Sequence, residues 1–254
     1  MSLYWLLYAF AWIAGGAYLI WEARQRRLPL TVAIDAVILS APLSLLFGHL
    51  VFAVLDGPVQ NLSGFLFTWR GWSGGYTSFG GVLGVMIAVP LVARIHQIDF
   101  PVAADLIAPA LYIGSFFGRL GCFFQGCCYG RATNHSWAVR FSPALTPGQT
   151  TAPCHPTQLY EAALSLVAFA LALQWLLRRP TMRAGNGVMA LCCLAGYFII
   201  RFVVEFFRAG GSAAASVGGL TTAQVISGPS AVLCIAWAIR RARCRPAGAS
   251  MLPE

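Results

Sequence analysis

The chain has 254 residues, of which 58% are hydrophobic and only 10% are charged, with a net charge of +9. A soluble domain carries about 25% charged residues, so this composition excludes an ordinary soluble globular protein. Its positive charge comes from arginine alone, which is common in membrane proteins and is no evidence for a nucleic acid partner. No polar linker divides the chain, which indicates one membrane domain over residues 1–254.

Apolar segments long enough to cross a bilayer recur seven times along the sequence. A hydrocarbon core of about 30 Å needs about 20 apolar residues in a helix. The segments are residues 3–21, 32–55, 79–95, 101–118, 158–177, 186–207 and 219–240. The pattern therefore predicts an all-α integral membrane protein with seven transmembrane helices. A short external head region is expected at about residues 131–157, between spans 4 and 5.

The arginines indicate how these spans are oriented. Eleven of the 17 follow spans 1, 3, 5 and 7, in short clusters beside the helix ends. The positive-inside rule makes that side cytoplasmic, so the N-terminus is expected outside and the C-terminus inside. The other six lie singly at the outer side, where topology does not require them; they are Arg70, Arg119, Arg131, Arg140, Arg201 and Arg208. Arginines within or beside spans are candidate functional residues.

Three motifs gather polar groups at this outer depth. The first is SFFGRLGCFFQGCCYG at residues 115–130, with Arg119, Gly118 and Gly121 at the expected end of span 4. Span 5 begins CHPTQLYE and contributes His155, Gln158, Tyr160 and Glu161. Span 6 ends RFVVEFFR, where Arg201, Glu205 and Arg208 share one helix face and can pair. Arginine's planar fork binds phosphate in a bidentate manner, so this cluster predicts a site for an anionic lipid head group.

Four cysteines lie between residues 122 and 154, outside the apolar runs. Cys122, Cys127, Cys128 and Cys154 fall in polar or loop-like segments on the oxidising side. A disulfide between Cys154 and one of the Cys122–Cys128 group is expected there. With His155 these residues also make a possible zinc set, but the spacing lacks the usual C-x2-C knuckle. We therefore predict no metal ion and no cofactor.

These three motifs, in this order, resemble those of the prolipoprotein diacylglyceryl transferase family, over about residues 70–240. The resemblance implies transfer of diacylglycerol from phosphatidylglycerol to the thiol of a lipobox cysteine in a lipoprotein precursor, in the bacterial plasma membrane. It implies that Arg119 and Arg201 hold the phosphate and that Glu205 orients an arginine or the head group. Further expected binding residues are Gly80, Gly81, Gly118, Gly121, Gln158, Tyr160, Glu161 and Arg208.

The chain departs from the family pattern where proton transfer is expected. Phe79 stands in place of a family histidine, and Cys122, Gln125 and Cys127 replace Asn, Asn and Glu. His155 or His49 is then a candidate base, and Cys127 a candidate nucleophile. Two alternatives stay open: a related head-group transferase with another acceptor or a cysteine-based mechanism, and a lipid-binding membrane protein without catalysis.

Overall fold

The computed structural model describes residues 3–55, 77–142, 148–179, 185–209 and 216–243. Seven helical spans within these residues are long and apolar enough to cross a membrane, which confirms the predicted all-α membrane architecture. They are α1 (Leu3–Gln25), α2 (Leu30–Leu55), α5 (Ser78–Ile95), α6 (Phe100–Ile107) followed by α7 (Ala110–Gln125), α8 (Thr157–Arg178), α9 (Val188–Glu205) and α10 (Thr222–Arg243). Two short strands, β1 (Ser216–Val217) and β2 (Leu220–Thr221), pair antiparallel before α10.

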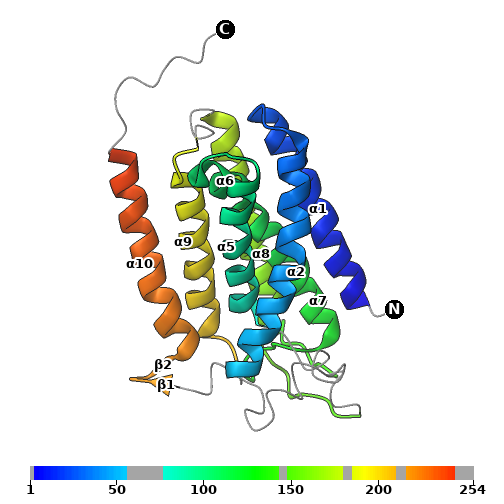
Figure 1. Cartoon of the computed structure of the whole chain (residues 1–254). Coiled ribbons are helices and arrows are strands. Elements are labelled where there is room, and N and C mark those ends of the chain that lie inside the picture. The colour runs from blue at the N-terminus through cyan, green and yellow to red at the C-terminus, as the bar shows by residue number, and fades with distance from the viewer. Residues whose placement is uncertain (1–2, 56–76, 143–147, 180–184, 210–215, 244–254) are drawn as a thin grey trace.

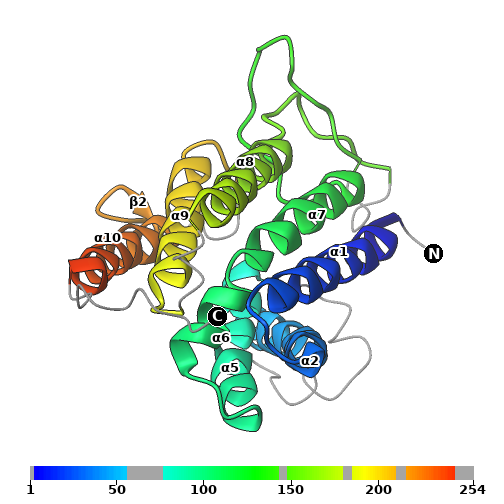
Figure 2. The ribbon, with the colours of Figure 1, turned by 90° about the horizontal axis from the view of Figure 1, so that it is seen from above.

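The helices form one bundle in which α7 links two groups. Seen from above, α1, α2 and α5 lie on one side of α7, and α8, α9 and α10 lie on the other (Figure 2). The most extensive packing joins α2 to α5, α9 to α10, α1 to α7 and α7 to α8. Side chains carried by α7 can therefore face both groups, which makes this helix the natural place for a shared site.

The two ends of the bundle differ in charge. The α1–α2 and α5–α6 turns and the last turns of α8 and α10 lie together at one end (Figure 1). That end carries most of the arginines that the topology argument used, among the described residues Arg24, Arg26, Arg27, Arg94, Arg178, Arg179, Arg240, Arg241 and Arg243. The loop after α7 and the β1–β2 hairpin lie at the opposite end (Figure 1). Arg70 falls outside the described residues.

Glycines bring α5 into backbone contact with α2. A Cβ atom on Gly80 would collide with the carbonyl oxygen of Phe47, and one on Gly84 with that of Leu43. Such close approach of two backbones is a common way of packing helices in a membrane, where dispersion replaces the hydrophobic effect. The contact fixes the start of α5, including Ser78 and Phe79, against the end of α2.

The fourth span is longer than its sequence predicts. The predicted span ends at residue 118, but α7 continues to Gln125. Glycine is tolerated inside membrane helices, so it did not mark the end here. Gly126 ends the helix instead, in the left-handed conformation with φ 69°. Arg119 therefore lies within the helix and not at its edge.

The segment between α7 and α8 is the head region, and backbone hydrogen bonds join its two ends and attach it to the residues that follow α9. The N–H of Gly130 donates to the carbonyl oxygen of His155, and that of Arg131 to Phe207, both at 2.8 Å. Inside the segment, the N–H of Val139 donates to Cys154 at 3.0 Å. The head is thus held next to the segment that follows α9, which carries Arg208.

Candidate functional site

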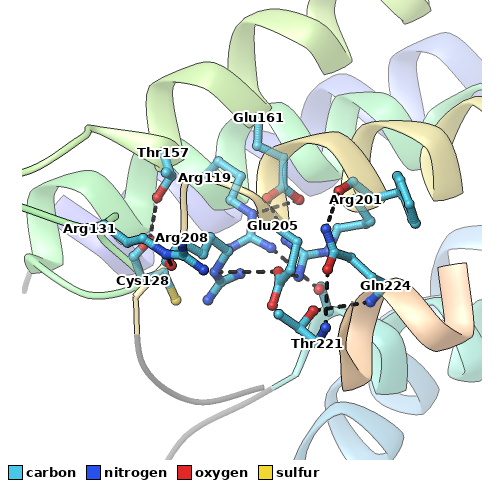
Figure 3. A network of polar contacts seen from close by, with 12 residues as sticks. Arg119, Cys128, Arg131, Thr157, Glu161, Arg201, Glu205, Arg208, Thr221 and Gln224 are labelled. Atoms are coloured by element: carbon cyan, nitrogen blue, oxygen red, sulfur yellow. Dashed lines mark hydrogen bonds and ion pairs between the residues drawn. The ribbon is translucent and has the colours of Figure 1, made fainter. Parts of the chain in front are cut away.

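A buried network of charged side chains joins α7, α8 and α9. Oε1 of Glu161 lies 2.9 Å from Nε of Arg119, and its Oε2 lies 2.8 Å from Arg201. Arg201 also contacts Glu205 at 3.1 Å, and Nε of Arg208 lies 3.9 Å from the same carboxylate. Figure 3 shows Glu161 between the two arginines. The predicted pairing of Arg201 with Glu205 along one helix face is confirmed. The prediction that Arg208 shares this face is wrong, because α9 ends at Glu205 and Arg208 pairs through its backbone with Gly130.

Among the described residues, the network has an excess of positive charge. Its three guanidinium groups face two carboxylates, and the side chains of Arg201, Glu161 and Glu205 are at most 2% exposed. Nε of Arg201 has no hydrogen-bond partner among the described residues, and its guanidinium lies 5.6 Å from the centre of the Phe79 ring. Uncompensated charge at low dielectric is costly, so the arrangement favours the binding of an anion.

A cavity of about 270 Å³ lies between α1, α2, α5 and α7, next to this network. Its wall is mostly apolar, and Arg119 is its one arginine among the described residues. Nη2 of Arg119 also donates to the hydroxyl of Ser78 at 3.4 Å, and Ser78 lines the same cavity. A chiefly apolar pocket with a single guanidinium suits an acyl lipid with an anionic head group.

The four predicted binding glycines divide into two kinds. Gly81 and Gly118 line the cavity, and a Cβ on Gly118 would meet nothing within 4 Å. Gly80 packs against α2, and a Cβ on Gly121 would lie 3.0 Å from the ring of Tyr4. Gly80 and Gly121 therefore act in helix packing, whereas Gly81 and Gly118 leave room for a ligand.

The end of α7 brings three cysteines together. The N–H of Cys127 donates to the carbonyl of Cys122 at 3.1 Å, as in a Schellman cap, and the sulfur atoms of Cys122, Cys127 and Cys128 lie within 4.8 Å of one another. Cys122 and Cys128 line the cavity. Hydrogen bonds from the thiols of Cys122 and Cys127, with Arg208 and Arg119 nearby, hold the pKa of Cys128 well below its usual range. Cys128 is thus better placed as a nucleophile than the predicted Cys127.

Two residues of α8 hold this cysteine loop in place. Nε2 of Gln158 donates to the carbonyl of Cys127 at 2.7 Å, and the hydroxyl of Thr157 to that of Cys128 at 2.9 Å. The second bond is drawn in Figure 3. Gln158, predicted to bind substrate, contacts the cysteine loop.

Cys154 lies apart from the three thiols. All seven described cysteines are free, and Sγ of Cys154 donates to the carbonyl of Val139 at 3.3 Å. The expected disulfide from Cys154 is therefore wrong for this structure. Its physical reason is that Cys154 pairs through its backbone with Val139 and Ala132, which directs its thiol into the head region.

The candidate base His155 lies in the head, at an aromatic cluster. Its Nδ1 lies 3.1 Å from the hydroxyl of Tyr160, which also accepts from Nε1 of Trp137 at 2.8 Å. Burial, with His135 as a second cause, lowers the pKa of His155 below its ordinary value. Neither His155 nor Tyr160 lines the cavity, and the other candidate base, His49, is fully buried within α2.

Some residues of the site were not anticipated from the sequence. Tyr4, Tyr8 and Trp12 of α1 line the cavity, as does Tyr197 of α9. Aromatic residues in an apolar span carry no signal that separates a cavity wall from a lipid-facing surface. Glu161 was expected as a binding residue, but its position between two arginines depends on the packing of three helices.

Comparisons with known proteins show the family of the chain. A family model described as prolipoprotein diacylglyceryl transferase matches residues 1–240. The phosphatidylglycerol–prolipoprotein diacylglyceryl transferase of Geobacter sulfurreducens is 35% identical over 239 residues, 93% of this chain and 89% of that protein. Proteins of the same name from Rhizobium meliloti and Idiomarina loihiensis are 34% and 38% identical over 208 and 177 residues, covering 80% and 69% of this chain and 70% and 63% of theirs. The chain belongs to the prolipoprotein diacylglyceryl transferase family and is a transferase of that family.

Proposed function

We propose that this chain transfers the diacylglyceryl group of phosphatidylglycerol to the cysteine thiol of a lipoprotein precursor with a lipobox. The observation that carries the proposal is the buried arginine network beside an apolar cavity, in a chain of this family. The product is a thioether, and glycerol phosphate leaves. The bilayer supplies the lipid substrate, and the reaction is proposed for the outer leaflet of the bacterial plasma membrane.

Arg119 is the proposed contact to the lipid phosphate. Arg119 lines the cavity, and Glu161 holds its Nε. Its Nη2 donates to the hydroxyl of Ser78, which lines the same cavity. Arg201 contacts the other oxygen of the Glu161 carboxylate. Its charge adds to the positive potential at the phosphate position. Because the described residues of the network carry one excess positive charge, they favour a head group of net charge −1. A zwitterionic lipid carries its own ammonium group and gains less.

The same arrangement serves the departing group. When the thiolate attacks the glycerol carbon, the carbon–oxygen bond breaks and negative charge grows on the phosphate. Arginines held by Glu161 and Glu205 need not reorganise as that charge develops. Gly81 and Gly118 leave space for the lipid, and the loop held by Gln158 closes the same end of the cavity. The head region, with His155 and Tyr160, is the proposed side of approach for the precursor.

The proposed orientation puts the N-terminus and head region outside and the C-terminus in the cytoplasm. The arginine-rich bundle end supports it. Alkaline phosphatase fused after residue 142 should be active in cells, and the same reporter fused after Arg243 should be inactive. The reverse pattern would overturn the orientation.

The function is tested with purified protein in phosphatidylglycerol liposomes and a lipobox peptide. Release of glycerol phosphate together with a peptide mass increase of one diacylglyceryl group is expected. A peptide with serine in place of the cysteine, and liposomes of phosphatidylethanolamine, are the controls. No release, while the Geobacter sulfurreducens relative is active in the same assay, would refute the proposal.

A matched pair of variants tests the role of Arg119. Arg119→Lys keeps the charge but loses the fork, and should lower the rate about 100-fold or more. Arg94→Lys makes the same change at an exposed position in the last turn of α5, at the other end of this helix from Ser78. This variant should leave the rate unchanged. Equal rates for the two variants would show that Arg119 does not hold the phosphate.

A further inference from the structure

The three thiols at the end of α7 have the spacing of a metal site. The sulfur atoms of Cys122, Cys127 and Cys128 all lie within 4.8 Å of one another. Zinc–thiolate bonds of about 2.3 Å in a tetrahedral site put sulfur atoms about 3.8 Å apart. Small side-chain rotations therefore suffice to bring all three sulfur atoms onto one ion.

The fold creates this cluster although the sequence lacks the usual C-x2-C spacing of zinc sites. In a Schellman cap the residue after the left-handed glycine returns to the residue five positions earlier, and here these are Cys127 and Cys122. Cys128 then takes a positive φ of 62°, unusual for a residue other than glycine. Such strain persists where surrounding structure enforces it, and the carbonyls of Cys127 and Cys128 are both held by α8.

The cluster has one side open to the cavity, because Cys122 and Cys128 belong to the cavity wall. Three protein ligands with an open fourth position are the pattern of a catalytic zinc site, whereas structural sites use four. No histidine or carboxylate is among the described residues that line this cavity. Among the described residues of its wall, a thiol substrate entering the cavity would therefore find no histidine or carboxylate to act as a base.

Nearby charges suit a bound ion. Zinc with three thiolates carries a net charge of −1, which is costly to bury alone. The positive fields of Arg208 and Arg119 act on Cys128, and Cys128 lies at the edge of the arginine network (Figure 3). The network can thus balance the charge of the loaded site.

We propose that Cys122, Cys127 and Cys128 bind one zinc ion, whose fourth position faces the cavity and takes the acceptor thiol. This inference rests on the proposed function for the identity of the acceptor. On binding zinc, the acceptor thiol loses its proton to water and becomes a metal-bound thiolate. Its sulfur then attacks the glycerol carbon of the lipid, the carbon–oxygen bond breaks, and the electron pair leaves with the phosphate.

Metal binding is tested on the full chain, purified with an affinity tag free of histidine. One zinc per chain is expected by elemental mass spectrometry. Replacement by cobalt should give the thiolate-to-cobalt charge-transfer band and the visible bands of a tetrahedral site. Cys122→Ser and Cys128→Ser should each weaken zinc binding about 100-fold or more in chelator competition. Cys154→Ser and Cys192→Ser, changes at free cysteines outside the cluster, should bind as the parent does.

The acceptor role is tested with the cobalt form. A lipobox peptide with its cysteine should shift the visible bands, and the serine peptide should not. Equal shifts with both peptides, or none with either, would overturn the acceptor role. The zinc site itself is overturned by absence of metal, by copper in place of zinc, by a disulfide within the cluster, or by equal loss of zinc in the Cys154→Ser control.

Glycerol phosphate release measured on the same preparations separates the two proposals. Release by a metal-free protein would refute the zinc inference and leave the proposed function standing. One zinc per chain without release from phosphatidylglycerol would refute the proposed function and leave the metal site standing. Release that falls on chelation and returns with zinc supports both.

Discussion

Glu161→Gln removes the charge that holds two arginines together and leaves the side-chain shape almost unchanged. Glu161 contacts Arg119 at 2.9 Å and Arg201 at 2.8 Å, and its side chain is 2% exposed. Two opposite charges about 4 Å apart attract by about 4 kcal/mol at an effective dielectric of 20. Arg201 keeps Glu205, but Arg119 has no other carboxylate contact among the described residues.

The loss in the free energy of unfolding caused by Glu161→Gln therefore comes mainly from the uncompensated charge of Arg119. Removing one partner of a buried ion pair costs about 3–5 kcal/mol, because a buried charge stays uncompensated. The free energy of unfolding can be measured by titrating detergent micelles with a denaturing detergent and following tryptophan fluorescence. The double variant Arg119→Met/Glu161→Gln should be more stable than the sum of the single changes by about 0.5–3 kcal/mol.

Two outcomes would refute this reasoning. Glu161→Gln within about 1 kcal/mol of the parent would mean that Glu161 does not compensate a buried charge. Additive single changes would mean that Arg119 and Glu161 act independently. Glu22→Gln is a useful control, because Glu22 is a buried carboxylate paired with Arg26 at 2.8 Å at the other end of the bundle, outside this network.

Three further changes test other parts of the structure. Gly80→Ala should destabilise the bundle by about 1–3 kcal/mol, because its Cβ meets the α2 backbone, whereas Gly118→Ala should not; equal effects in the same denaturation assay would contradict the packing argument. Phe79→Leu should cost about 0.5–2 kcal/mol by removing the ring beneath Arg201, and Phe79→Tyr should retain it; equal stability of the two variants would argue against a cation–π contact. Because the pKa of His155 is lowered on folding, its contribution is complete above the ordinary histidine pKa of about 6.5 and declines as pH falls toward the lowered value. The melting temperature should thus drop from pH 7.5 to 5.5, and His155→Gln should drop less; an unchanged pH profile in the variant would contradict the assignment.

Hydropathy and local spacing were enough for the architecture and for part of the site. Seven apolar runs gave seven spans because bilayer thickness fixes helix length. The four-residue spacing of Arg201 and Glu205 predicted their contact because it depends only on helix geometry. The arginine asymmetry predicted an outer depth for Arg119, which stays a prediction.

What could not be predicted depends on contacts between distant segments. Glu161 reaches Arg119 and Arg201 only because α8 packs beside α7 and lies next to α9. The helix α7 extends beyond its predicted end because glycine signals a helix end in water more reliably than in a membrane. The sequence offered Cys122 and Cys127 only as members of a possible zinc set with Cys154 and His155, because C-x4-C is unusual for metal sites and becomes close only through the helix cap.

The buried excess charge also has a consequence for solution conditions. Attraction between exposed charges weakens as salt rises, because mobile ions screen it over about 10 Å at 0.1 M. The arginines of this network are covered by protein, with side chains of Arg119 and Arg201 only 9% and 2% exposed. Counterions cannot approach them closely. Selection of an anionic lipid by this site should thus persist at ionic strengths that detach proteins held to membranes by surface charge.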